Sequence, residues 1–331
     1  MNPSLALVAD IGGTNARFAL ADVSLAAPLL LDSARQLEVN QFPSLVDAAQ
    51  HYLGALDPGA GSVGKGVFAV AGRVDGDEAR ITNHPWLISR AATATALGLH
   101  AFHLVNDFTA QAMAVELLTE RDLVVVGAVP RSTSNAASRT YAVIGPGTGL
   151  GVSALVVRNG MSFALETEGG HVGFSPSTPE EMEILREVSR EFGRVSDERL
   201  LSGRGLSNIQ QALSRLSGDA NAQALRPQEI TERARRGDAV CSRAVETFCS
   251  VFGSIAGDLV LTLGAWDGVF LTGGLVPKLL PELQGPVFRE RFEAKGRFAS
   301  AMAAVPTLAV IHPQAGLLGA AAHARNIIER I

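Results

Sequence analysis

Short apolar runs flank a glycine-rich turn near the start of the chain. Residues 5–9 and 18–21 are apolar, and the turn Gly12-Gly13-Thr14-Asn15 lies between them. Runs of this length, bounded by turn residues, predict two strands joined as a hairpin.

The same pattern returns in the middle of the chain. Residues 141–144 and 152–157 flank a second glycine-rich turn at 145–151. Placing Gly147-Thr148 on Gly13-Thr14 gives an offset of 134 residues, which predicts two related halves.

Further strands and helices alternate along the chain. Residues 102–105 predict a strand that runs into the polar junction 106–109 and then into the helical stretch 110–118. Thr178 predicts an N-cap, with Pro179 in the first turn of a helix that continues through 182–192. The remaining predictions are strands at 67–71, 269–272 and 308–311 and helices at 242–263 and 317–331, so the predicted fold class is α/β.

Composition and charge narrow the class of protein. The 331 residues are 47% hydrophobic and 18% charged, which is enough apolar surface for a folded chain of two domains. The formal net charge of −5 lacks the basic footprint of a nucleic-acid-binding protein. Two cysteines, Cys241 and Cys249, cannot form a disulfide framework or a four-cysteine zinc site, which predicts a reducing, cytoplasmic setting.

The apolar segments predict neither export nor a membrane span. The first run stops at Asp10, too short for a signal peptide and without a basic flank. Residues 299–324 carry no Asp, Glu, Lys or Arg, but Pro306 and His312 interrupt them, so we expect a buried strand, a turn and the start of a helix. The polar stretch 131–139 predicts a surface loop.

Glycine is the most informative residue in the composition. The chain has 34 glycines, above the ~7% average, and they cluster at the ends of apolar runs. Glycine lets a backbone approach a ligand closely, and phosphate bound by backbone N–H groups is the usual reason. The sequence therefore favours a nucleotide-binding protein.

Two common nucleotide motifs are nonetheless incomplete. The stretch 59–66 satisfies GxxxxGK, but Gly66 stands where a P-loop needs Ser or Thr, and no strand precedes it, so we expect a surface turn. The second glycine turn does not complete GxGxxG, because Leu150 and Val152 occupy the required positions. A Rossmann dinucleotide site therefore loses its main support.

Asp10 and the glycine turn after it form the first candidate site. Backbone N–H groups in such a turn can bind an anion, and the Asp10 carboxylate can hold a metal ion or its water. An ordinary hairpin in which Asp10 accepts a turn hydrogen bond explains this motif equally well. Two such turns, at matching places in two halves, favour phosphate binding by both.

Other polar segments are candidates for a second substrate, although each has an ordinary structural explanation. Glu168-Gly169-Gly170-His171 offers a carboxylate and an imidazole to the hydroxyls of a polyol, with glycines that let a ligand come close, or it is a surface turn. Asn106-Asp107 could simply cap a helix, and Glu198 could be a helix surface charge. Gly273-Gly274 follows a strand and could be a simple turn.

Taken in order, these segments resemble the bacterial glucokinase family, the hexokinases of the actin-like ATPase superfamily. The resemblance extends from residues 5–17 to 316–319 and includes Thr82-Asn83-His84-Pro85-Trp86, Asn106-Asp107-Phe108-Thr109-Ala110, Gly147-Thr148-Gly149-Leu150-Gly151, Glu168-Gly169-Gly170-His171-Val172 and Leu201-Ser202-Gly203. The chain lacks the cysteine-rich zinc motif of related sugar kinases, which indicates the zinc-free branch. Pro146 and Thr167 depart from the family's pattern, and Pro146 removes one N–H donor from the second turn.

The resemblance implies a role for each candidate residue. Asp107 is the expected catalytic base, which takes the proton from the 6-hydroxyl of glucose, and the expected sugar-binding residues are Asn106, Glu168, His171 and Glu198. The expected ATP-binding residues are Ala9, Asp10, Ile11, Gly12, Gly13, Thr14, Gly147, Thr148, Gly149, Gly273 and Gly274. Mg²⁺ is expected to bridge the phosphates of ATP, with Asp10 holding it through a water molecule.

The resemblance also implies the architecture. We expect a two-domain actin-like ATPase (ribonuclease H-like) α/β fold with an active-site cleft between the domains, the small domain formed by residues 1–117 and 312–331 and the large one by 118–311. The expected protein is a cytoplasmic, homodimeric glucokinase that converts D-glucose and ATP to glucose 6-phosphate and binds neither nucleic acid nor membrane.

Two alternatives stay open. A kinase of another hexose, such as fructose or mannose, would carry the same motifs, because discrimination between epimers depends on pocket geometry. A non-catalytic sugar or nucleotide sensor, or an actin-like ATPase that binds no sugar, is disfavoured by the joint presence of both turns, Asp107 and the sugar-binding residues.

Overall fold

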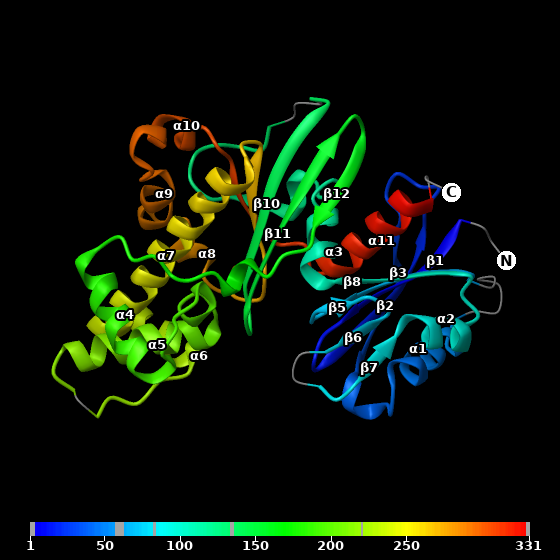
Figure 1. Ribbon diagram of the computed structural model, residues 1–331, viewed down its shortest axis with the longest axis horizontal. Helices are drawn as coiled ribbons and strands as arrows, with labels where there is room; N and C mark the ends of the chain where they lie inside the picture. The colour runs from blue at the N-terminus through cyan, green and yellow to red at the C-terminus, as the bar shows by residue number, and fades with distance from the viewer. Residues whose placement is uncertain (1–3, 57–62, 82–83, 133–135, 220, 329–331) are drawn as a thin grey trace. The chain divides into compact units, whose positions relative to one another are not determined.

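The chain divides into two compact units (Figure 1). The structure, a computed structural model, describes residues 4–56, 63–81, 84–132, 136–219 and 221–328. Unit 1 comprises Met1–Thr119, Leu155–Glu166 and His312–Ile331, and unit 2 comprises Glu120–Ala154 and Thr167–Ile311.

Unit 1 is built on a five-stranded sheet with the order β3-β2-β1-β4-β8. Strand β2 pairs antiparallel with both β1 and β3, whereas β1, β4 and β8 are parallel. A separate three-stranded sheet has the order β5-β6-β7. The strands are β1 Leu5–Ile11, β2 Asn15–Asp22, β3 Leu29–Glu38, β4 Lys65–Val70, β5 Val74–Asp75, β6 Glu78–Arg80, β7 Leu87–Ser89 and β8 Ala101–Asn106.

Helices pack on this sheet because its strands alternate between two buried faces. Leu7, Ala9 and Ile11 of β1 lie in one apolar core with Ala48 and Tyr52 of a helix. On α11, a side chain at Gly319 would overlap the carbonyl oxygen of Ala110, so α11 lies directly against α3. The helices of unit 1 are α1 Leu45–Gly54, α2 Arg90–Leu97, α3 Asp107–Ala114 and α11 Ala315–Ile328, with a 3₁₀ turn η1 at Val39–Gln41.

The larger sheet has the order β12-β11-β10-β13-β14-β9. Its first five strands repeat the order of the unit 1 sheet, with a hairpin pair followed by parallel strands, and β9 is added antiparallel to β14. The related halves predicted from the two glycine turns are therefore present in the topology. The strands are β9 Leu123–Val125, β10 Ser138–Pro146, β11 Leu150–Arg158, β12 Met161–Leu165, β13 Gly268–Leu271 and β14 Thr307–Val310.

Helix α7, Ala239–Leu263, is the central helix of unit 2 (Figure 1). It is the one helix among the described residues that is long and apolar enough to cross a bilayer, but 72% of its apolar window is buried in the protein, as in a core helix. Cys241 and Cys249 lie on it, buried and free. The other helices of unit 2 are α4 Pro179–Phe192, α5 Gly203–Leu216, α6 Pro227–Arg235, α8 Leu280–Leu283, α9 Pro286–Glu293 and α10 Ala299–Ala303, with 3₁₀ turns η3 Glu120–Asp122, η4 Gly169–His171, η5 Asp197–Arg199 and η6 Gly296–Phe298.

These elements confirm the predicted α/β class and most predicted segments. Thr178 accepts a hydrogen bond from Glu181 N and caps α4. Residues 299–324 include β14 and the start of α11, as expected, but also the short helix α10, which was not predicted. Several boundaries were wrong. The predicted helix 110–118 is Asp107–Ala114 and begins earlier because Asn106 caps it, and the predicted helix 242–263 begins at Ala239. The predicted loop 131–139 already includes the first residues of β10. Residues 57–62, 82–83, 133–135 and 329–331 of the predicted segments lie outside the described residues, and Lys65 and Gly66 of the GxxxxGK stretch belong to β4.

Candidate functional site

The first glycine turn joins β1 to β2. Gly12 N donates to Asn15 O at 2.9 Å and closes the turn, while Thr14 is exposed. Ala9 and Ile11 are fully buried in the core of unit 1, so only their backbone atoms could contact a nucleotide.

Asp10 lies on the opposite face of β1 from these two residues, because successive side chains of a strand alternate. Its Oδ2 accepts a hydrogen bond from Arg17 Nη1 at 3.2 Å, and its side chain is 21% exposed. On this face the first turn of α11 comes close, since a Cβ at Gly316 would lie 2.6 Å from Asp10 Oδ2. Burial raises the pKa of Asp10, and the Arg17 guanidinium partly offsets this effect. A helix N-terminus also favours a nearby negative charge.

Asn106 and Asp107 form the junction between β8 and α3. Asn106 Oδ1 accepts hydrogen bonds from Phe108 N at 2.9 Å and Thr109 N at 3.3 Å, and Asn106 Nδ2 donates to Gly72 O at 3.0 Å. Asp107 Oδ1 accepts from Phe108 N at 3.0 Å. Asn106 is thus a helix cap, as one interpretation of the sequence held, and the cap fixes the backbone that carries Asp107.

The parallel strands bring this junction level with the first turn. Ile11 of β1 is paired with Val70 of β4, and Val70 is paired with Asn106 of β8. Neighbouring strands lie about 4.8 Å apart, so Ile11 and Asn106 are separated by roughly 10 Å. The carboxyl ends of parallel strands are the usual ligand-binding edge of an α/β sheet.

The second glycine turn lies beside the turn at Gly273 and Gly274. Gly147 N donates to Gly149 O at 2.8 Å, and Leu275 N donates to Pro146 O at 3.1 Å. Gly273 has a φ of +86°, and a Cβ there would lie 2.6 Å from Pro146 O. Two segments assigned to the nucleotide are therefore adjacent in unit 2.

The Glu-Gly-Gly-His segment folds into η4 on the start of β11. Glu168 Oε2 and His171 Nε2 are 3.9 Å apart, and their side chains are 62% and 58% exposed, so both can reach a ligand from solvent. A side chain at Gly170 would overlap the carbonyl oxygen of Leu150, and a Cβ at Gly169 would lie 2.8 Å from Val152 Cγ1. The two glycines are therefore explained by packing on β11, which differs from the ligand approach inferred from the sequence.

Glu198, on η5, reaches the second turn. Its Oε2 accepts a hydrogen bond from Leu150 N at 2.9 Å, and a side chain at Gly149 would overlap the same oxygen. Further along, Gly203 N donates to Gly147 O at 2.9 Å. Glu198 is therefore not a free helix surface charge, which was its alternative interpretation.

Hydrogen bonds also join η4 to the segment that carries Glu198. Arg194 Nη2 donates to His171 O at 2.7 Å, and Asp197 N donates to Val172 O at 2.9 Å. Burial, together with the charge of Asp258, raises the pKa of the Asp197 carboxyl to about 7, although Arg194 acts in the opposite direction.

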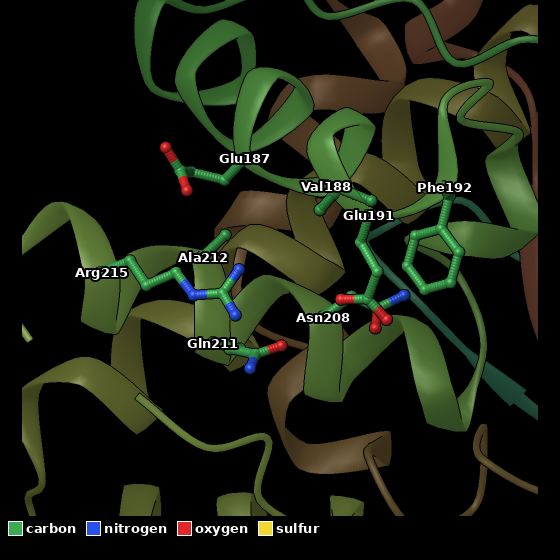
Figure 2. A pocket seen from close by; sticks show the side chains of 8 residues that line it. All are labelled: Glu187, Val188, Glu191, Phe192, Asn208, Gln211, Ala212 and Arg215. Carbon is green, nitrogen blue, oxygen red and sulfur yellow. The ribbon is translucent and has the colours of Figure 1, made fainter. Parts of the chain in front are cut away.

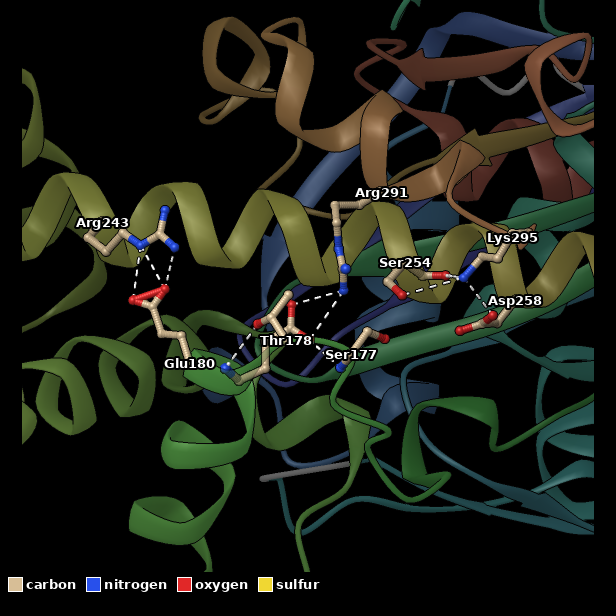
Figure 3. A network of polar contacts seen from close by, with 9 residues as sticks. Ser177, Thr178, Glu180, Arg243, Ser254, Asp258, Arg291 and Lys295 are labelled. Carbon is tan, nitrogen blue, oxygen red and sulfur yellow. Dashed lines mark hydrogen bonds and ion pairs between the residues drawn. The ribbon is translucent and has the colours of Figure 1, made fainter. Parts of the chain in front are cut away.

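Asp258 belongs to a polar network that joins α7 to Lys295, which follows α9 (Figure 3). Lys295 Nζ donates to Asp258 Oδ1 at 2.6 Å and to Ser254 O at 2.9 Å. Asp258 therefore has a cationic partner in Lys295, while its own negative charge contributes to the raised pKa of Asp197.

Two surface pockets lie away from the candidate residues. The first, of about 200 Å³, lies between α4 and α5, whose side chains reach toward one another across it (Figure 2). The second, of about 260 Å³, is lined by residues of β1, β4, β8 and α11. Neither pocket includes a predicted site residue.

The donor set near the first turn fits Mg²⁺ bound together with a nucleotide. Among the described residues, no group of three or more His, Cys, Asp or Glu side chains could hold a metal ion. Mg²⁺ usually takes one or two protein carboxylates plus substrate phosphates, so a single carboxylate such as Asp10 is sufficient.

Three supporting residues were missed at the sequence level. Arg17 could have been found, because the hairpin register pairs Asp10 with Arg17. Arg194 and Leu150 had no local signal, since their partners His171 and Glu198 are 23 and 48 residues away.

Comparison with solved structures defines the class of protein. A glucokinase from an Antarctic psychrotroph aligns with a TM-score of 0.88 and 34% identity, over 98% of this chain and 99% of that one. A ROK family glucokinase from Streptomyces griseus, solved with glucose and AMPPNP, aligns with a TM-score of 0.61 and 20% identity, over 97% of this chain and 99% of that one. The predicted actin-like ATPase fold is therefore confirmed, and the class is that of the actin-like sugar kinases.

Sequence comparison identifies the family within that class. The family model described as Glucokinase matches residues 7–327. A glucokinase of Stenotrophomonas maltophilia is 61% identical over 328 residues, which cover 98% of this chain and 96% of that protein. The chain belongs to the glucokinase family, and the predicted enzyme class, a hexose kinase, is confirmed.

Proposed function

We propose that the protein transfers the γ-phosphoryl group of ATP to the 6-hydroxyl of D-glucose, with Asp107 as the general base. The observation that carries this proposal is the position of Asp107, the first residue of α3, at the carboxyl edge of the unit 1 sheet and level with the first glycine turn. The 61% identity to a glucokinase supports glucose as the hexose.

Asp107 accepts the proton of the 6-hydroxyl as that oxygen attacks the phosphorus. A base that takes this proton contributes about 10²- to 10⁴-fold to the rate. Asn106 is fixed by three backbone hydrogen bonds, so it holds the start of α3 while its neighbour acts. Phosphoryl transfer depends mainly on such positioning and on charge stabilisation.

The hexose hydroxyls are assigned to Glu168, His171 and Glu198, with Asn106. Carboxylates accept from hydroxyls, and a neutral imidazole can donate to one and accept from another. Support comes from the 3.9 Å separation of Glu168 and His171 and from their exposure, which leaves both side chains accessible.

The nucleotide is assigned to the two glycine turns and to Gly273-Gly274. The AMPPNP bound to the Streptomyces griseus glucokinase supports ATP as the phosphoryl donor. Backbone N–H groups of the turns bind the phosphates. Mg²⁺, held near Asp10, would supply positive charge to the phosphate oxygens when bound. We also propose a cytoplasmic homodimer, for which sedimentation of the purified protein is the direct test.

A coupled assay of ADP release tests the function. We expect release with glucose to exceed that with fructose, mannose or no sugar, and Asp107→Asn to lower turnover by about 10²-fold or more with little change in glucose affinity. Asp75→Asn, at an exposed ion pair with Arg73, is the matched control and should be as active as the parent protein.

The other outcomes separate the alternatives. Faster turnover with fructose or mannose would identify another hexose kinase, and sugar-independent ADP release would identify an ATPase. Binding of glucose without any ADP release would identify a sensor. Near-normal turnover of Asp107→Asn would remove Asp107 from the mechanism.

A further inference from the structure

Glu198 contacts the backbone of the second glycine turn, in addition to the hexose hydroxyl that the proposed function assigns to it. The Glu198 carboxylate accepts at 2.9 Å from Leu150 N, on the residue of the turn with which β11 begins. At the other end of the same segment, Gly203 N donates to Gly147 O at 2.9 Å. The segment 198–203 therefore contacts the turn at both ends.

Gly149 makes this contact possible. A side chain at Gly149 would overlap Glu198 Oε2, so the carboxylate occupies the space that a Cβ would fill. The segment is itself ordered, because Ser202 Oγ donates to Glu198 O at 2.8 Å and accepts from Gly205 N at 2.9 Å as the cap of α5. We therefore expect a displacement of Glu198 to displace the turn as well, because the segment between them is held by hydrogen bonds.

The second hexose-binding segment rests on the same residue of β11. Gly170 lies so close to the carbonyl oxygen of Leu150 that no side chain fits between them. Arg194 and Asp197 tie the backbone at His171 and Val172 to the segment before Glu198. Leu150 therefore contacts Glu198 through its N–H group and η4 through its carbonyl oxygen.

We propose that Glu198 couples hexose binding to nucleotide binding by holding the second phosphate turn in its binding conformation. A carboxylate can accept about four hydrogen bonds, so Glu198 can bind a hexose hydroxyl and Leu150 N together. A hexose that fixes the carboxylate also fixes the turn, and a nucleotide that binds the ordered turn loses less conformational freedom. The proposal rests on the assignment of Glu198 to the hexose and of the second turn to the nucleotide.

The test is the affinity of AMPPNP with Mg²⁺, measured by calorimetry on the full chain with and without saturating glucose. In the parent protein we expect glucose to tighten AMPPNP binding about 5-fold or more, the lower end of the usual range for coupled sites. Glu198→Ala should bring this ratio close to one. Glu198→Gln should keep it within about twofold, because the amide oxygen can still accept from Leu150 N.

Asp75→Asn is the matched control. It removes a carboxylate from an exposed ion pair with Arg73, outside both assigned sites, and should leave the AMPPNP ratio as in the parent protein. Gly149→Ala is the second variant, whose Cβ displaces the carboxylate without removing it, and its ratio should also fall toward one. This variant keeps the test available if Glu198→Ala does not fold.

Two results would overturn the coupling. One is a parent ratio of one, and the other is a parent ratio that survives in both Glu198→Ala and Gly149→Ala. Either result with glucose-dependent ADP release intact contradicts this inference alone. Absence of glucose-dependent ADP release from the parent protein contradicts the proposed function instead.

Discussion

The two glycine turns occupy the same place in two related sheets, yet they obtain their carboxylate from different sources. In the first turn, Asp10 belongs to the strand that enters the turn and pairs with Arg17 across the hairpin. In the second turn, Ile144 stands at the position of Asp10, and the carboxylate comes from Glu198, 48 residues from Leu150. The two sheets repeat the strand order around the turn, but the side chains at the turn differ.

This difference makes one turn self-contained and the other dependent on its surroundings. The first turn is closed by the hydrogen bond from Gly12 to Asn15, and a side chain at Gly12 would meet only an ordinary contact at 3.6 Å. The second turn has Gly149 where the first has Asn15, because Glu198 fills the adjacent space. We expect substitutions around the second turn to act on stability and those around the first to act on chemistry.

The largest expected effect is on folding. Gly170→Ala should lower the free energy of unfolding by about 3–5 kcal/mol, because its Cβ overlaps the backbone of Leu150 and neither segment can move away without breaking hydrogen bonds. Gly12→Ala is the counterpart in the first turn and should change it by less than about 1 kcal/mol. Urea unfolding of both variants measures the two changes in the free energy of unfolding. Equal losses would contradict the proposed difference between the two turns.

The next effect is on turnover. Asp10→Asn should lower kcat by about 10²- to 10³-fold with little change in glucose affinity, because the first turn loses its negative charge and Arg17 loses its ionic partner. Steady-state kinetics and glucose titration measure the two quantities. The control is Asp22→Asn, at the far end of the same hairpin, and a kcat for Asp10→Asn like that of this control would contradict a role for the charge.

The next prediction concerns the pH dependence of stability that arises from Asp197, whose backbone joins η4 to the segment that carries Glu198. Folding raises the pKa of the Asp197 carboxyl from 3.8 to about 7, so the folded chain holds this proton at pH values where the unfolded chain has lost it. Its contribution to stability is therefore complete below about pH 4 and declines as the pH rises to about 7. Between pH 5 and pH 8 this amounts to roughly 2–3 kcal/mol.

Asp197→Asn should remove this decline. We expect the difference between the free energies of unfolding at pH 5 and pH 8 to be smaller in the variant by that amount, as measured in urea at both pH values. Asp75→Asn controls for the loss of a surface carboxylate. An unchanged pH difference in Asp197→Asn would show that the carboxyl titrates alike in both states.

The smallest expected effect is at the position that matches Gly149. Asn15 Oδ1 accepts from the exposed Gln36 Nε2 at 3.1 Å, a contact that contributes little in water. Asn15→Ala should change stability by less than about 0.5 kcal/mol, whereas Gly149→Ala should destabilise the protein measurably. Thermal unfolding of the two variants measures their stabilities. A larger decrease in Tm for Asn15→Ala than for Gly149→Ala would contradict this prediction.

Local sequence signals predicted the parts of the fold that are set by neighbouring residues. The apolar runs on either side of Gly12 and Gly147 gave both hairpins, and Thr178 followed by Pro179 gave the start of α4. The sequence also predicted the polar junction at Asn106, because the capping interaction involves only neighbouring residues. The helix itself begins at Asp107, earlier than predicted.

The supports of the second turn could not be predicted in this way. The contacts of Glu198 with Leu150 and of Gly170 with the same residue join segments far apart in sequence, and no periodicity marks them. The glycines at 149 and 170 were visible, but the sequence does not show whether a missing side chain makes room for a ligand or for the protein's own chain. In the structure, the protein's own chain fills this space at both positions, with Leu150 at Gly170 and Glu198 at Gly149.

The close contact of Gly319 with Ala110 has a consequence for the order of folding. The helix that supports α3, and with it Asp107, lies some two hundred residues later in the sequence, after all of unit 2. During synthesis, unit 2 can fold while unit 1 still lacks α11, since domains generally fold as units from the N-terminal side and long-range contacts form late. We expect pulse-labelled hydrogen exchange during refolding to protect α7 before α3, so that the proposed catalytic base is among the last groups to be positioned.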